Sequence, residues 1–187
     1  MHSLNHFFFK FIISNPGKIF LNNVKFIFIT FLATFANQVN AEKVKKMGTH
    51  KDWETYIINS EKGKVCFAQS KPVLQAPKTS TREARLFISF RPGENITNEI
   101  SITSGYNFNN KNAIKAISGK NKYVFDIVRE NFAWITDGKF EKRMIKTMQK
   151  GSRIMVKAHN QKGSQTIDHY SLLGFTKAYK ATKANCS

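Results

Sequence analysis

The chain has 187 residues, and its 30 basic side chains against 12 acidic ones give a formal net charge of +18. That length suits one domain with at most one appendage and is enough for a hydrophobic core of ordinary size. Lysine outnumbers arginine by 24 to 6, which indicates AT-rich codon usage and argues against nucleic-acid binding, because proteins that read phosphates and base edges rely on the planar fork of arginine.

The first 41 residues have the composition of a secretory signal peptide. They contain no acidic residue and three lysines, and a largely apolar run from Phe26 to Ala36 ends shortly before Ala41. The run has eleven residues, whereas a membrane-spanning helix needs about 20. The sequence therefore predicts that residues 1–41 are a signal peptide, cleaved between Ala41 and Glu42, and that residues 42–187 form the mature domain.

The segment that precedes Lys25 is long for such a leader. If translation began at Val24, the leader would be a compact 18 residues and residues 1–23 would be a mis-assigned start. Detection of peptides from residues 1–23 in the precursor by mass spectrometry would exclude this interpretation.

Alternating apolar and polar residues predict strands through most of the mature chain. Residues 42–51 are polar and are expected to be a loose end, and the Pro- and Ser-containing stretch 72–81 is expected to be a loop. The strands are expected at 52–59, 64–70, 85–91, 99–106, 113–118, 122–128, 132–136, 153–159 and 166–172. Several short strands at roughly ten-residue intervals are typical of a β-sandwich or barrel.

Two short helices interrupt the strands. The first is expected after Asp137, and Gly151 is expected to end it in the left-handed conformation. The second is expected to begin near Leu172 and to be capped by Ser171. Their apolar faces would carry Phe140, Met144, Ile145 and Met148 in the first helix, and Phe175, Ala178, Tyr179 and Cys186 in the second.

The chain contains two cysteines, Cys66 and Cys186. In an exported protein an even number predicts a disulfide. A reactive thiol has little support, because neither cysteine has a Cys-x-x-Cys partner or a histidine nearby in the sequence. Closing a loop of about 120 residues would stabilise the fold by several kcal/mol in the chain-entropy model. The bond would fasten the terminal helix to the edge of a sheet.

Candidate catalytic and metal-binding groups are few. His159 and His169 flank the predicted turn of the last hairpin, and Asp168 lies beside one of them, but histidines on hairpins are common and this set is thin for a metal site. Acidic residues such as Asp126 and Asp137 are scattered and suit surface or capping positions better than an acid–base pair. The sequence also has no nucleophile elbow or phosphate-binding glycine loop, so no catalytic residue, metal ligand or cofactor is assigned.

Short matches to one protein family run through nearly all of residues 52–187. The matching positions are Trp53, Arg91, Pro92, Gly93, Gly105, Tyr106, Trp134, Met148, Gly151, Asp168, Tyr170, Ser171, Leu172, Gly174 and Phe175, together with Cys66 and Cys186. In this order and spacing the chain resembles the invasion-associated locus B (IalB) family of alphaproteobacteria. Some members carry a further cysteine where this chain has Ile57 and Ile58. The chain therefore resembles the subgroup with one disulfide, and Cys66 and Cys186 match the cysteine pair of that subgroup.

The resemblance implies an immunoglobulin-like β-sandwich. We expect this sandwich to carry the two short helices, one of them at the C-terminus, and to hold Trp53 and Trp134 in or near its core. It also implies export to the periplasm, the outer membrane or the exterior, and it brings no catalytic residues. We therefore expect a non-catalytic, envelope-associated binding or accessory protein with no membrane span in its mature form. Its partner would be a protein or an anionic component such as lipid or lipopolysaccharide, attracted by the basic surface. The alternative is a periplasmic small-ligand binder or enzyme, which would need a concave polar pocket.

Overall fold

The computed structural model describes residues 43–60, 63–78 and 81–186. The predicted signal peptide and its cleavage site between Ala41 and Glu42 lie outside these residues. Within the described ranges, no helix is both long and apolar enough to cross a membrane.

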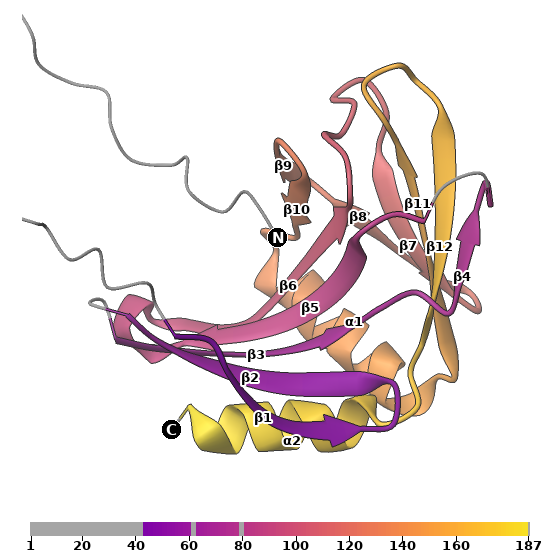
Figure 1. Cartoon of the computed structure of the whole chain (residues 1–187). Coiled ribbons are helices and arrows are strands. Elements are labelled where there is room, and N and C mark those ends of the chain that lie inside the picture. Colours follow the sequence, from indigo (N-terminus) through magenta and orange to yellow (C-terminus); the bar gives the residue numbers. More distant parts are fainter. Residues whose placement is uncertain (1–42, 61–62, 79–80, 187) are drawn as a thin grey trace, which may run out of the picture. The chain divides into compact units, whose positions relative to one another are not determined.

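The larger of two antiparallel sheets has seven strands in the order β1-β2-β3-β5-β6-β10-β9 (Figure 1). These are β1 (Lys45–His50), β2 (Trp53–Ser60), β3 (Gly63–Ser70), β5 (Ala84–Arg91), β6 (Ile96–Ser104), β9 (Ile127–Arg129) and β10 (Phe132–Trp134). The prediction of a loose end over residues 42–51 is wrong from Lys45 onward, because β1 pairs with β2 as an edge strand. Its mostly exposed side chains do not alternate between apolar and polar, which explains why the pattern missed it.

The smaller sheet has five strands in the order β4-β12-β11-β7-β8. These are β4 (Leu74–Ala76), β7 (Ile114–Ser118), β8 (Asn121–Phe125), β11 (Arg153–His159) and β12 (Gln165–Ser171). The expected loop over 72–81 therefore contains a strand, which pairs with β12 at the edge of this sheet. With three residues, β4 is too short to show a period in the sequence.

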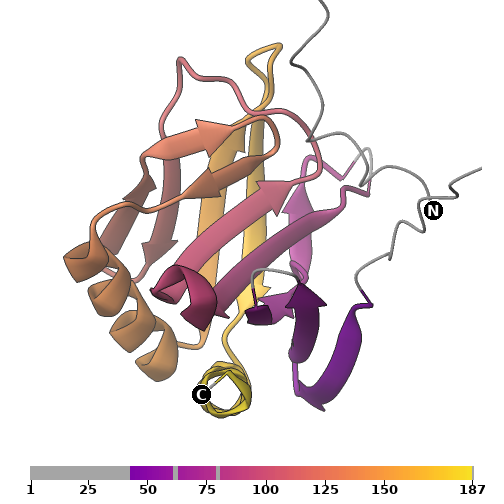
Figure 2. The same ribbon diagram turned by 90° about the vertical axis from the view of Figure 1, so that its left-hand side faces the viewer.

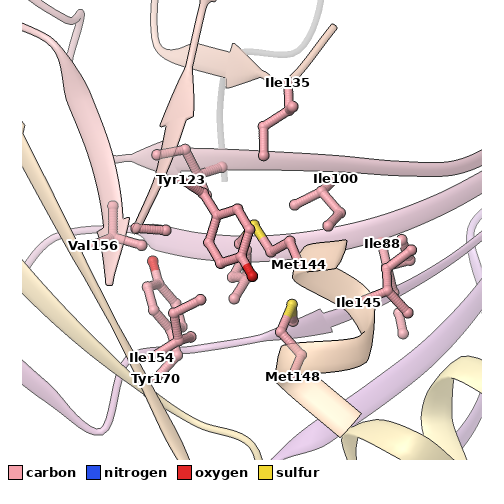
Figure 3. Close-up of a cluster of buried hydrophobic side chains, with 14 of the residues drawn as sticks. Ile88, Ile100, Tyr123, Ile135, Met144, Ile145, Met148, Ile154, Val156 and Tyr170 are labelled. Carbon is pink, nitrogen blue, oxygen red and sulfur yellow. The ribbon is translucent and has the colours of Figure 1, made fainter. Parts of the chain in front are cut away.

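Both sheets contribute their inward-facing side chains to one hydrophobic core (Figure 3). Alternation along β5 and β6 buries Ile88 and Ile100 completely, and alternation along β11 buries Ile154. Trp53 is also fully buried, whereas Trp134 is half-buried. The prediction of an all-β, sandwich-like fold with two helices is confirmed.

Helix α1 (Gly138–Lys150) begins at Asp137, whose carboxylate accepts hydrogen bonds from the backbone N–H groups of Lys139 and Phe140. The helix buries Met144, Ile145 and Met148. Gly151 follows it in an extended conformation (φ −86°, ψ 167°), so the predicted left-handed stop is wrong. Glycine is needed there for space, because a Cβ would lie 3.0 Å from the Thr147 carbonyl oxygen and 3.1 Å from Leu172 Cδ1.

Helix α2 (Phe175–Asn185) lies alongside β2 and β3 and is viewed along its axis in Figure 2. The prediction that Ser171 caps this helix is wrong. Ser171 ends β12, and its hydroxyl accepts a hydrogen bond from the Leu173 N–H at 3.2 Å. The position before the helix is occupied by Gly174 at φ +90°, a conformation that glycine adopts without steric cost.

Candidate functional site

The predicted disulfide joins Cys66 in β3 to Cys186 at the end of α2, with their Cα atoms 5.7 Å apart. Both cysteines are buried. The prediction that the bond fastens the helix to the edge of a sheet is wrong, because β3 lies between β2 and β5. It therefore fastens the C-terminal helix to an inner strand of the larger sheet.

A buried ion pair connects the two sheets near the end of β6. Asp168 of β12 is 1% exposed and accepts hydrogen bonds from both terminal nitrogens of Arg82, at 3.0 and 2.6 Å. Arg82 also donates to the Ser104 carbonyl oxygen, and Gln75 of β4 donates to Asp168. No motif or periodic pattern in the sequence identifies Arg82. The one indication in the sequence was Asp168, an acidic residue at an inward-facing strand position, because a buried carboxylate requires a partner.

Two motif tyrosines, Tyr106 and Tyr170, lie beside this ion pair. The Tyr106 hydroxyl is 2.5 Å from the Thr166 hydroxyl, and the Arg82 guanidinium lies 5.8 Å from the centre of the Tyr106 ring. Burial raises the pKa of both tyrosines above the ordinary value. Gly105 permits the turn, because it adopts φ +76° and a Cβ would lie 2.7 Å from a backbone nitrogen.

The other motif residues serve the framework in separate places. Arg91 forms two hydrogen bonds of 2.7 Å with Glu99 across β5 and β6, and a short 3-10 turn follows it at Pro92–Glu94. Trp53 donates from its indole N–H to the Ser171 carbonyl oxygen and packs against Phe175 with ring centres 4.9 Å apart. These contacts, and those of Asp168, are structural.

The two histidines considered as metal ligands do not face each other. His169 pairs with Met155 across the β11–β12 hairpin, whereas His159 pairs with Gln165 near the turn. Across the described part of the chain, no group of three or more histidine, cysteine, aspartate or glutamate side chains is placed to hold a metal ion.

A concave surface, which we call the basic hollow, lies where the C-terminal half of α1 meets the β7–β8 turn and the start of β11. Its volume is about 890 Å³. Five cationic side chains line it: Lys120, Arg143, Lys146, Lys150 and Arg153. All the other described lining residues are uncharged, and none of the five cations forms a salt bridge with a described acidic residue.

Helix periodicity brings three of these cations together. Arg143, Lys146 and Lys150 are spaced by three and four residues, so they share one face of α1. The Arg143 guanidinium stacks over the Phe140 ring at 4.3 Å, which limits its movement. The C-terminal end of a helix carries about half a negative charge and favours nearby cations. That partial charge is small beside five cations, so the hollow is a site of positive potential.

The sequence comparison with family models decides the family. The model described as "Invasion associated locus B (IalB) protein" matches residues 53–183. The chain belongs to the IalB family. This confirms the resemblance found in the sequence, and every residue of the basic hollow lies within the matched range of this IalB family chain.

The fold is similar to that in the crystal structure of invasion associated protein B from Bartonella henselae. The TM-score is 0.52, and the similarity covers 75% of this chain and 97% of that chain at 13% sequence identity. At that identity the likeness shows a shared IalB fold alone. No curated protein sequence matches the chain.

Proposed function

We propose that this IalB family protein is an exported, non-catalytic binding protein that associates with anionic components of the cell envelope. The basic hollow is the observation that carries the proposal. Five cations converge on one concave surface with no described acidic neighbour among its lining residues. Such an arrangement attracts anionic groups over a distance and lets several of them bind at once. Lipid and lipopolysaccharide are envelope components that carry groups of this kind.

Export to the periplasm, the outer membrane or the exterior is part of the same proposal. The apolar, basic leader supports it, and so does the Cys66–Cys186 disulfide, since disulfides persist in oxidising compartments. Fractionation of the native organism, followed by thiol labelling, tests the location. Recovery of the reduced, uncleaved chain from the cytosol would contradict it.

Binding to anionic vesicles and to purified lipopolysaccharide tests the site. In the variant Lys146→Gln/Lys150→Gln we expect vesicle affinity to fall about thirtyfold, since each lysine near an anionic surface contributes about 1 kcal/mol. The matched control is Lys111→Gln/Lys162→Gln, which removes the same charge from exposed loop positions away from the hollow. We expect the control to change affinity by about twofold, because distant exposed charges are screened. Equal losses in the two variants would contradict a binding site in the hollow.

A second candidate function, small-ligand binding, has one observation in its favour. A hollow of about 390 Å³ lies beside Arg82, Tyr106 and Thr166. One of its lining residues, Arg82, has a buried Nε with no hydrogen-bond partner among the described residues. Native mass spectrometry of protein purified from its own envelope would reveal a retained small molecule. A mass equal to that of the chain alone would exclude a tightly bound ligand.

A further inference from the structure

Leu173 lies on the rim of the basic hollow with its side chain in solvent. It is 60% exposed, more than any other large hydrophobic residue in the described chain. Its neighbours behave differently, since Leu172 is 4% exposed and Phe175 is fully buried. An exposed leucine surrounded by cations therefore stands between two core residues.

The backbone holds Leu173 in a fixed position. Its N–H donates to the Ser171 hydroxyl at 3.2 Å, and its carbonyl oxygen accepts from the Asp52 N–H at 3.3 Å. The next residue, Gly174, packs so closely that a Cβ there would overlap the His50 carbonyl oxygen. Because this turn is already ordered, presenting the leucine to a partner costs little conformational entropy.

We propose that the basic hollow docks on an anionic phospholipid surface, with Leu173 inserting among the lipids while the cations contact their phosphates. The proposal rests on the proposed function and names its anionic partner. A soluble polyanion would use the cations alone and would leave the leucine in water. A membrane interface uses both, because peripheral binding combines buried apolar surface with attraction to anionic headgroups.

The charges near Leu173 favour this docking. Lys150 and Arg153 line the hollow with it. Asp52 is the acidic residue in contact with the turn, through its backbone N–H, and it does not line the hollow. The charged side chains that line the hollow with the leucine are therefore all cationic.

The test compares two probes, vesicles of phosphatidylcholine with about 30% phosphatidylglycerol and soluble polyphosphate. In Leu173→Ala we expect vesicle affinity to fall about tenfold, the loss that follows from keeping most of a leucine side chain out of the lipid. Polyphosphate affinity should be unchanged. The control Val124→Ala removes another exposed apolar side chain (47% exposed), away from the hollow, and should change neither affinity.

A second variant reports insertion directly. Leu173→Trp places an indole at the rim, and its fluorescence should shift to the blue with anionic vesicles and be quenched by brominated lipid. Unchanged vesicle binding in Leu173→Ala, or equal loss for both probes, would overturn insertion and leave the proposed function standing. Wild-type binding to polyphosphate but not to vesicles would do the same. Failure of the wild type to bind either vesicles or polyphosphate would overturn both proposals.

Discussion

Arg82 and Asp168 form a buried ion pair that ties the smaller sheet to the larger one, with two hydrogen bonds of 3.0 and 2.6 Å. Asp168 belongs to the longest run of family motif residues, yet its carboxylate is directed to Arg82 and Gln75 and is closed to solvent. Its place in the motif is therefore explained by packing, because an unpaired buried charge is costly.

Removal of one partner of this pair should destabilise the protein strongly. We expect Arg82→Met to lower the free energy of unfolding by about 3–5 kcal/mol, because it leaves the Asp168 carboxylate buried without its cation. Arg82→Met/Asp168→Asn should cost less than the sum of the single changes, since the two side chains interact directly. Urea denaturation of Arg82→Met, Asp168→Asn and the double variant measures the three free energies of unfolding. Additive losses would contradict the coupling.

The disulfide should contribute a large part of the stability. Cys186→Ser opens a loop of 120 residues and should lower the free energy of unfolding by about 5 kcal/mol in the chain-entropy model. Denatured protein purified without reductant should show no free thiol in a colorimetric assay. Two free thiols per chain would mean that the bond does not form in the native protein.

Gly174 and Gly163 separate two reasons for choosing glycine. Both have positive φ, +90° and +84°, but a Cβ at Gly174 would overlap the His50 carbonyl oxygen, whereas one at Gly163 would meet nothing within 4 Å. We expect Gly163→Ala to cost about 1 kcal/mol, for the left-handed backbone alone. Gly174→Ala should cost at least twice as much by chemical denaturation, since β1 must also move. Similar costs would show that the turn is not held against β1 in solution.

Glu141 should make the stability depend on pH. The pKa of its carboxyl is raised from the ordinary 4.5 to about 7. Burial is the main cause, and the nearby charges of Glu99 and Asp126 act in the same direction. The hydrogen bond from the Ile100 N–H acts in the opposite direction. Between these values the folded state holds a proton that the unfolded chain has released, so the contribution of Glu141 to stability is fully present below about pH 4.5 and is lost by about pH 7.

The variant Glu141→Gln isolates this effect, because the amide keeps an acceptor for the Ile100 N–H and does not titrate. We expect its urea midpoint to vary less between pH 5 and 7 than that of the wild type. Other groups titrate equally in both proteins, so the difference between the two curves reports Glu141. Parallel curves would show that its pKa is not raised in the folded protein.

The sequence predicted the elements whose side chains alternate or recur, and missed those held by pairing alone. β5 and β11 have inward apolar residues at every second position, and α1 has a cap at Asp137 and an apolar stripe. In contrast, β1 has no such period, and it is held in the sheet by its pairing with β2. Local patterns carry no information on that pairing.

The candidate site was less accessible to sequence reasoning. The net charge predicted an attraction to anions but not a place for it. The basic hollow gathers its five cations from the β7–β8 turn, α1 and the start of β11, and each of these cations alone looks like an ordinary solvated side chain. Leu173 likewise follows a buried leucine, and its local sequence does not show which of the two leucines is exposed.

The salt dependence of binding to anionic vesicles tests the central claim most directly, because attraction between exposed charges weakens as the screening length shortens. We expect the wild type to bind vesicles containing phosphatidylglycerol and to lose at least about tenfold in affinity between about 50 and about 300 mM salt. Lys146→Gln/Lys150→Gln should bind weakly and show a shallower dependence. Binding that is equally tight at both salt concentrations, or that does not require anionic lipid, would contradict an anion site in the basic hollow.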